Sequence, residues 1–295
     1  MKERTRNTIF RILSAVVGLP IYVFAIYTDA LHAIPALAVS TIITTVTLNE
    51  YYKITEKSEG ERAFSVAGLS AAVLINITMY LYAYGNIYGH GAYFRGFDAR
   101  VIIGILVLFF MVIVILQVFT RPLKGASYSM GTTIFGIMYI VVSFSHIILM
   151  KSLINGFYYI FIIHAVIMLN DTGAYFGGVY FGRHKTGFAA SPNKSWEGYF
   201  SGLLVSIIAM ILTNQLFDSF FNISLFTMIE AGVLGIILSI LGNTGDLIES
   251  VIKRDGSIKD SGSIIPGHGG MWDVFDSLIF TIPLFYYYLI LRGVH

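Results

Sequence analysis

Residues 250–276, SVIKRDGSIKDSGSIIPGHGGMWDVFD, combine side chains that bind phosphate with side chains that bind metal ions. The basic residues of this segment can bind phosphate oxygens: Lys253, Arg254 and Lys259. Asp273 and Asp276 are three residues apart, a spacing that places two side chains on one face of a helix. Carboxylate oxygens suit a hard divalent cation such as Mg²⁺. The segment therefore predicts a site where phosphate and a metal ion are handled together.

A glycine-rich turn precedes the two aspartates. Gly269 and Gly270 lack a Cβ, so their backbone amides can approach a substrate oxygen closely. His268 precedes these glycines, and the chain has no cysteine. Because a zinc site needs several His or Cys ligands at suitable spacing, zinc is disfavoured. His268 is then expected to carry a proton or to form hydrogen bonds in the turn.

A third aspartate lies upstream of this segment. Asp246, Glu249 and Lys253 recur at helical spacing and share one face. Two simpler explanations stay open, since Glu249 and Lys253 can form an ion pair and a carboxylate in the first turn of a helix can cap it. Three converging carboxylates repel one another unless a cation lies among them. Asp246, Asp273 and Asp276 are therefore predicted to hold Mg²⁺.

Polar residues also gather in residues 170–198. Asp171 lies near the end of an apolar segment, where a charge needs an ion, water or a charged partner. An ion pair with Lys194 or Arg183 and a functional role for Asp171 are equally open. Ser191 and Lys194 resemble a phosphate-binding turn, but the Walker A spacing is absent, which excludes a P-loop enzyme.

The composition is that of an integral membrane protein. Of the 295 residues 56% are hydrophobic and 12% are charged, and the mean hydropathy is +0.75. Soluble domains are about 45–50% apolar and about 25% charged. The net charge of +2 is too small to indicate nucleic acid as a partner.

The apolar segments predict an all-α, polytopic membrane protein with about nine transmembrane helices, since each span needs about 20 apolar residues. The predicted spans are 9–28, 31–48, 64–84, 101–120, 129–149, 155–180, 198–217, 224–247 and 273–292. They form one membrane domain, residues 1–295. Residues 1–150 contain its N-terminal and middle spans, and residues 151–295 contain the catalytic spans and loops.

The distribution of positive charge predicts the orientation. With the N-terminus in the cytoplasm, fifteen of the 19 lysines and arginines fall on the cytoplasmic side. The positive-inside rule supports this arrangement in the cell (inner) membrane. The mixed-charge segment 49–62 is then expected to be a solvated cytoplasmic turn. The loops 181–197 and 248–272, rich in basic residues, Gly and Ser, are predicted to meet at one site that faces the cytoplasm.

The C-terminal half resembles the CDP-diacylglycerol synthases, also called phosphatidate cytidylyltransferases. Their signature has a serine, Lys-Arg after two residues, Lys-Asp after four more, a small residue, Pro-x-His-Gly-Gly and paired aspartates. The matching residues here are Ser250, Lys253, Arg254, Lys259, Asp260, Gly262, His268, Gly269, Gly270, Asp273 and Asp276. Residues 171–175 and 191–198 look like the family's two other marked segments, so the motifs cover residues 170–277.

Two positions depart from the family pattern. Val274 stands where the family usually has Arg between the paired aspartates, and Asn193 replaces a common Lys. The loss of a cation beside the metal site is expected to weaken phosphate binding. The neighbouring Lys194 is retained.

The resemblance implies an enzyme that transfers CMP from CTP to phosphatidic acid and releases pyrophosphate. It implies catalytic roles for Asp246, Asp273, Lys253 and Lys259. The residues expected to bind substrate are Asp171, Ser191, Lys194, Arg254, His268, Gly269 and Gly270. Mg²⁺ is the implied cofactor, with a second cation such as K⁺, and the implied assembly is a homodimer in the lipid bilayer.

Two other functions fit some of the same residues. A CTP-dependent lipid kinase would use the same nucleotide but transfer its γ-phosphate. An ion-coupled transporter would also place carboxylates among apolar helices, although transporters often contain repeats that are not visible here.

Overall fold

The fold is all-α in the computed structural model, which describes residues 16, 18, 20–28, 33–58, 60–87 and 99–294. The helices follow in the order α2 (Ile34–Ile54), α3 (Ser65–Ile87), α4 (Ala99–Thr120), α5 (Ala126–Gly136), η2 (Ile137–Val142), α6 (Ser143–Lys151), α7 (Gly156–Phe181), α8 (Trp196–Phe221), α9 (Met228–Asp255) and α10 (Met271–Leu291). α5, η2 and α6 are continuous, and η2 is π-helical. Over the described residues, β-structure is limited to isolated bridges.

Seven helices among the described residues are long and apolar enough to cross a membrane: α3, α4, the continuous helix Ala126–Lys151, α7, α8, α9 and α10. The prediction of a polytopic, all-α membrane protein is confirmed. Part of the first predicted span, residues 9–28, lies outside the described residues, and residues 20–27 of this span are helical.

The second predicted span coincides with most of α2, which is helical but is not among these seven helices. Polar side chains contribute to its buried face: Ser40, Thr44, Thr47 and Glu50. Asn76 of α3 accepts from Ser40 Oγ at 2.7 Å and donates to Thr44 Oγ1 at 3.0 Å. Buried hydrogen bonds therefore join α2 to α3 in addition to apolar contacts.

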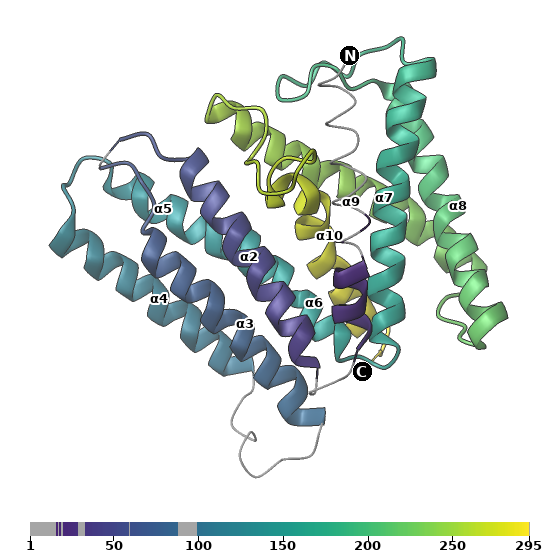
Figure 1. Cartoon of the computed structure of the whole chain (residues 1–295), viewed down its shortest axis with the longest axis horizontal. Helices are drawn as coiled ribbons and strands as arrows, with labels where there is room; N and C mark the ends of the chain where they lie inside the picture. The colour runs from purple at the N-terminus through teal and green to yellow at the C-terminus, as the bar shows by residue number, and fades with distance from the viewer. Residues whose placement is uncertain are drawn as a thin grey trace.

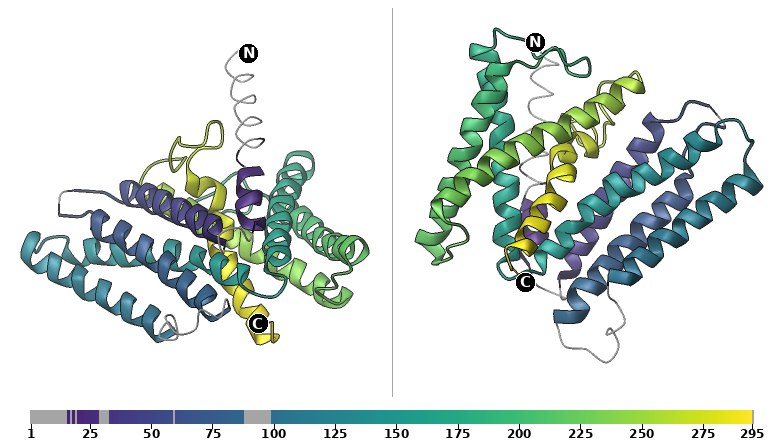
Figure 2. Two further views of the ribbon diagram at one scale, coloured as in Figure 1. Left: turned by 60° about the horizontal axis from the view of Figure 1, so that its bottom comes forward. Right: turned by 180° about the vertical axis from the view of Figure 1, so that it is seen from behind.

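α10 is the element that joins the two parts of the bundle. It packs against α2, α6, α7 and α9, and it lies between the group α2–α6 and the group α7–α9 (Figure 1; Figure 2, right). Phe144 of α6 and Phe275 of α10 form an edge-to-face pair with ring centroids 5.4 Å apart. The fully buried Trp272 contacts Tyr51 of α2, with centroids 5.5 Å apart. The start of α10 is thereby held against helices from the first half of the chain.

The connections that follow α2, α4, α7 and α9 lie at one end of the bundle (Figure 1). Lys57, after α2, pairs with Asp255 at the end of α9 at 3.2 Å. Arg254 Nε donates to the carbonyl of Ala190, after α7, at 3.3 Å. The prediction that the loops 181–197 and 248–272 meet is therefore confirmed. We refer to this end of the molecule as the basic end.

Close contact between α9 and α10 depends on Gly245. A Cβ at this position would lie 2.8 Å from the carbonyl oxygen of Asp276 and 2.9 Å from Ser277 Cα. Both of those atoms belong to backbone, which cannot move aside as a flexible side chain can. The absence of a side chain at Gly245 therefore brings Asp246 close to Asp276.

We expect Gly245→Ala to destabilise the protein by about 1–3 kcal/mol, because overpacking forces backbone shifts. Gly232→Ala on the same helix is the matched control, since a Cβ there would meet nothing within 4 Å. The control should be neutral or up to about 1 kcal/mol more stable, as alanine favours helix. Thermal unfolding of both purified variants in detergent measures the difference, and equal stability of the two would contradict the close-contact argument.

Candidate active site

A cleft of about 640 Å³ opens at the basic end, between α7, α9, α10 and the segment before α8. The predicted site residues that line it are Asp171, Lys194, Asp246, Asp273 and Asp276. They come from three helices and one loop that are far apart in the sequence. Helix packing thus brings together the two segments that the sequence marked as polar.

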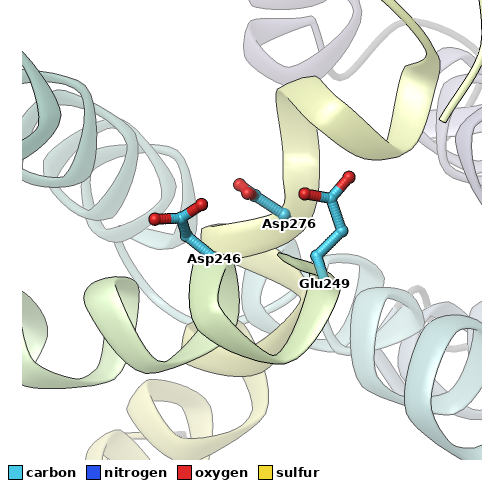
Figure 3. A group of neighbouring side chains, drawn as sticks. All are labelled: Asp246, Glu249 and Asp276. Carbon is cyan, nitrogen blue, oxygen red and sulfur yellow. The ribbon is translucent and has the colours of Figure 1, made fainter. Parts of the chain in front are cut away.

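Three carboxylates meet in or beside this cleft: Asp246, Glu249 and Asp276 (Figure 3). One oxygen from each lies within 4.8 Å of the others. Asp246 and Glu249 are one turn apart on α9, and Asp276 faces them from α10 (Figure 3). Such closely spaced negative charges repel one another unless a cation lies near them. We call this group the carboxylate cluster.

The cluster fits a divalent cation by its donor chemistry. Glu249 is 1% exposed, and its Oε1 is buried with no hydrogen-bond partner among the described residues. A buried carboxylate oxygen without a partner is costly, and a metal ion would satisfy it. A few carboxylates, completed by water and phosphate oxygens, are typical of Mg²⁺ sites.

Asp273 does not join the carboxylate cluster. Its Oδ1 pairs with Lys253 Nζ at 2.7 Å. Its Oδ2 accepts from the amides of Gly270 at 2.7 Å and Ser261 at 2.8 Å, and from Ser261 Oγ at 2.9 Å. Asp273 therefore caps the first turn of α10, which is the simpler explanation that its position in the sequence left open. Glu249 takes the place among the three close carboxylates that the sequence assigned to Asp273.

Lys253 lies between two carboxylates. Its Nζ is 2.6 Å from Glu249 Oε2 and 2.7 Å from Asp273 Oδ1. The ion pair between Glu249 and Lys253, which the spacing left open as a simpler explanation, is present. Lys253 thereby connects the carboxylate cluster on α9 to the capped start of α10.

Lys194 pairs with Asp246 through its Nζ. Burial lowers the pKa of Lys194, while the charges of Asp276, Asp171 and Glu249 act in the opposite direction. The ammonium group also lies 5.5 Å from the centroid of the Tyr199 ring. Lys194 is thus a cation directed into the cleft by the segment before α8.

Asp171 lines the cleft from α7 but has a different partner from those expected. Its Oδ1 accepts from Asn170 Nδ2 at 3.2 Å, and neither Lys194 nor Arg183 forms an ion pair with it. Of the two explanations that the sequence left open for Asp171, the ion pair with one of these residues does not form, because Lys194 reaches Asp246 instead.

The other predicted site residues lie in the loops around the cleft or in the last turn of α9 and are not part of the cleft lining. Ser191 forms a turn with Lys194, whose amide donates to its carbonyl at 3.2 Å. Arg254 joins the two loops through Ala190, and its Nη1 also donates to the carbonyl of Ile258 at 3.0 Å. Lys259 and His268 are exposed.

The glycine turn uses its amides within the protein. The amide of Gly269, where φ is 98°, donates to the carbonyl of Ile265 at 3.2 Å. The amide of Gly270 donates to Asp273. A Cβ at Gly270 would collide with Ser261 Oγ. Backbone conformation and close packing therefore explain why glycine occupies both positions, in addition to the substrate contact predicted for them.

Val274 lies outside the cleft lining and is 40% exposed. The carboxylate cluster forms although Val274 stands where the resemblance led us to expect an arginine. On the same helix, Asp273 pairs with Lys253 and caps the first turn, and Asp276 belongs to the carboxylate cluster.

Glu50 is a residue that the sequence did not mark as important. It is 4% exposed and lies on α2, yet it accepts from the amides of Met271 at 3.0 Å and Trp272 at 2.9 Å. It also accepts from Ser261 Oγ at 3.2 Å. Glu50 therefore supplies a second carboxylate cap to α10 from a helix more than 200 residues away in the sequence.

The prediction of a solvated turn over residues 49–62 is wrong for its first part. α2 continues to Ile54, and Glu50, Tyr51 and Tyr52 are buried. A signal was present in the sequence, because Leu48, Tyr51 and Tyr52 follow the i, i+3, i+4 spacing of the apolar face of a helix.

Comparison with known proteins identifies similar sequences. The pattern of the cytidylyltransferase family matches residues 9–291. The phosphatidate cytidylyltransferase of Staphylococcus saprophyticus is 42% identical over 148 residues, which is 50% of this chain and 54% of that protein. Those of Staphylococcus epidermidis and Staphylococcus aureus are 43% and 42% identical over 130 residues, which is 44% of this chain and 48% of each relative. The chain thus matches about half the length of these curated relatives.

We expect Glu50→Gln to destabilise the protein by about 1–3 kcal/mol, because an amide nitrogen would replace one of the acceptor oxygens and leave a buried N–H unpaired. Glu56→Gln, just beyond α2, is the control, since Glu56 is exposed and should change stability by less than about 0.5 kcal/mol. Thermal unfolding in detergent tests the difference. If the two variants were equally stable, Glu50 would not be a significant cap of α10.

Proposed function

Because the chain belongs to the cytidylyltransferase family, we propose that it transfers the cytidylyl group of CTP to phosphatidic acid, giving CDP-diacylglycerol and pyrophosphate. The relatives that it matches over about half their length are named phosphatidate cytidylyltransferases. The observation that carries the proposal is the carboxylate cluster, which lies opposite Lys194 at a cleft between membrane helices.

The reaction joins two anions. A phosphate oxygen of phosphatidic acid would attack the α-phosphorus of CTP, the bond from that phosphorus to the bridging oxygen would break, and pyrophosphate would leave. The attacking oxygen is already anionic, so no strong general base is needed. Catalysis then depends on positioning and on neutralising charge.

Asp246, Glu249 and Asp276 would hold Mg²⁺. When bound, the ion would neutralise negative charge on the triphosphate oxygens. Lys194, now paired with Asp246, is placed to bind a phosphate oxygen in the same cleft. The ammonium group of Lys253 already lies between the carboxylates of Glu249 and Asp273, so these two residues are not assigned to the second, monovalent cation, and we assign no others to it.

Two orphaned hydroxyl groups also support a polar ligand in the cleft. Tyr199 OH and Ser277 Oγ are buried without hydrogen-bond partners among the described residues, and both residues line the cleft. Phosphate or ribose oxygens of a bound nucleotide could satisfy these groups, because buried hydroxyls normally have a partner.

We also propose that the protein lies in the cell membrane with its basic end in the cytoplasm. The positive-inside rule favours this orientation, and CTP is a cytosolic nucleotide. Phosphatidic acid would then reach the cleft from the adjacent leaflet. A homodimer remains part of this proposal.

We expect Asp246→Asn and Asp276→Asn each to lower cytidylyl transfer by at least about 100-fold, because each removes charge from the site that binds the triphosphate. The assay follows label from CTP into lipid, with phosphatidic acid and Mg²⁺ present. Label at the α-phosphorus should enter the lipid, and label at the γ-phosphorus should not.

Asp218→Asn is the control for this assay, because Asp218 is exposed and lies outside the cleft. It should retain activity close to that of the unaltered protein. Transfer of γ-label to lipid would identify a lipid kinase instead. Near-normal transfer by either cluster variant would contradict the assigned site.

The two possible metal-ligand sets predict different results for Mg²⁺ binding. We expect Mg²⁺ to raise the thermal stability of the protein, and Glu249→Gln to reduce that increase because a ligand oxygen is lost. Asp255→Asn on the same helix, where the side chain is 61% exposed, should retain the full increase. If Glu249→Gln retained it and Asp273→Asn lost it, the set Asp246, Asp273 and Asp276 would be the correct one.

A further inference from the structure

A second cavity lies at the basic end, apart from the cleft, where α2 ends, α3 begins and α4 ends. Its volume is about 330 Å³. Three basic side chains line it: Lys53, Arg62 and Arg121. We call it the basic pocket. None of its lining residues belongs to the lining of the cleft.

Arg121 is held in a fixed position within the basic pocket. Its guanidinium donates to the carbonyls of Arg62 and Ala63, the latter at 2.9 Å. The same group lies over the ring of Phe64, 3.8 Å from the centroid. A guanidinium so placed is already oriented for a ligand, which reduces the entropy lost on binding.

Positive charge in the basic pocket is only partly balanced. Burial lowers the pKa of Arg121, and the neighbouring charge of Arg62 lowers it further. Among the described residues, Glu56 is the one carboxylate in the lining, and it forms no ion pair with any of the three cations. Converging cations are unfavourable unless an anion lies among them.

The backbone at the start of α3 adds to this positive potential. Residues 65–67 line the basic pocket, and the first turn of the 23-residue helix has no acidic side chain. The first amides of a helix lack partners within the helix and carry partial positive charge. The helix end thus reinforces the cations rather than compensating for them.

The wall of the basic pocket is apolar on the side of the membrane helices. Val66, which is 82% exposed, and Leu116 line it beside the cations. Both belong to helices that are apolar enough to cross a membrane. A ligand that fits this arrangement has a negative head and an apolar body.

We propose that the basic pocket binds the phosphate of an anionic phospholipid, with the acyl chains lying along α3 and α4. Basic pockets between transmembrane helices at the membrane surface are suited to lipid head groups. Free inorganic phosphate shares the same chemistry at the cations, but it would make no use of Val66 and Leu116. This inference does not depend on the reaction catalysed at the cleft.

Binding at the basic pocket would act on elements that also support the cleft. Lys53 lies one turn after Glu50, the residue on α2 that caps α10. Lys57, in the connection that follows α2, pairs with Asp255 at the end of α9. A bound lipid is therefore expected to stabilise the contacts between α2, α9 and α10.

The test is a lipid titration of the full chain, purified in detergent and followed by native mass spectrometry. Phosphatidylglycerol is the anionic probe, and phosphatidylcholine is the zwitterionic comparison. We expect preferential binding of phosphatidylglycerol, and about fivefold weaker binding for Arg62→Gln or Lys53→Gln, because each cation near the membrane surface contributes about that factor.

Lys124→Gln is the matched control. Lys124 is exposed at the same end of the molecule and lies outside the basic pocket, so its loss should change affinity by less than about twofold. Equal weakening by Lys124→Gln and Arg62→Gln would overturn the proposal, since general surface charge would then explain binding. Equal binding of the two lipids would also overturn it.

A thermal-shift measurement separates the two sources of phosphate. Phosphatidylglycerol should raise the unfolding temperature of the unaltered protein more than that of Arg62→Gln. If inorganic phosphate alone produced the same Arg62-dependent increase and the lipid produced none, a lipid would not be the ligand of the basic pocket.

Discussion

Buried negative charge is the constraint on which the basic end of this molecule depends. Glu50 and Glu249 are almost fully buried, and a carboxylate in such surroundings needs a cation or several N–H donors. Glu249 has Lys253, and Glu50 has two backbone amides and a hydroxyl. Lys253 lies on the same helix as Glu249, whereas the partners of Glu50 on α2 come from α10 and the segment before it. Helices that are distant in the sequence must therefore meet in one arrangement for the charge of Glu50 to be compensated.

The start of α10 is the point where these requirements converge. Its first amides donate to Glu50 and the preceding Gly270 amide donates to Asp273, so two carboxylates share one helix end. Two caps leave little space, and a Cβ at Gly270 would lie 2.7 Å from the Glu50 carboxylate oxygens. The glycine turn is thus explained by packing around the caps. With the turn fixed, Asp276 is presented one turn later toward α9.

The cleft and the basic pocket differ in charge balance although they lie at the same end of the bundle. In the cleft, carboxylates outnumber the cations around them, so a polyanion such as a triphosphate would need a metal ion to bind there. Over the part of the chain that the structure describes, the basic pocket has three cations and one carboxylate, so a phosphate would need no metal ion to bind there. Two ligands that both carry phosphate can therefore be bound differently, one through a metal ion in the cleft and the other directly by the basic side chains of the basic pocket.

The sequence by itself determined the membrane character, the meeting of two polar loops, and the participation of Asp246 and Asp276 in a carboxylate site. The first two follow from apolar segment length and loop composition, and the pair of Glu249 with Lys253 follows from spacing along a single helix. The shared site of Asp246 and Asp276, which lie on different helices, follows from the cation that converging carboxylates need. The tertiary structure alone decided that Glu249 joins the cluster, that Asp273 caps α10, and that Glu50 does so from α2. The reason is physical: helical spacing determines which side chains share a face, but the packing of distant helices determines which faces meet.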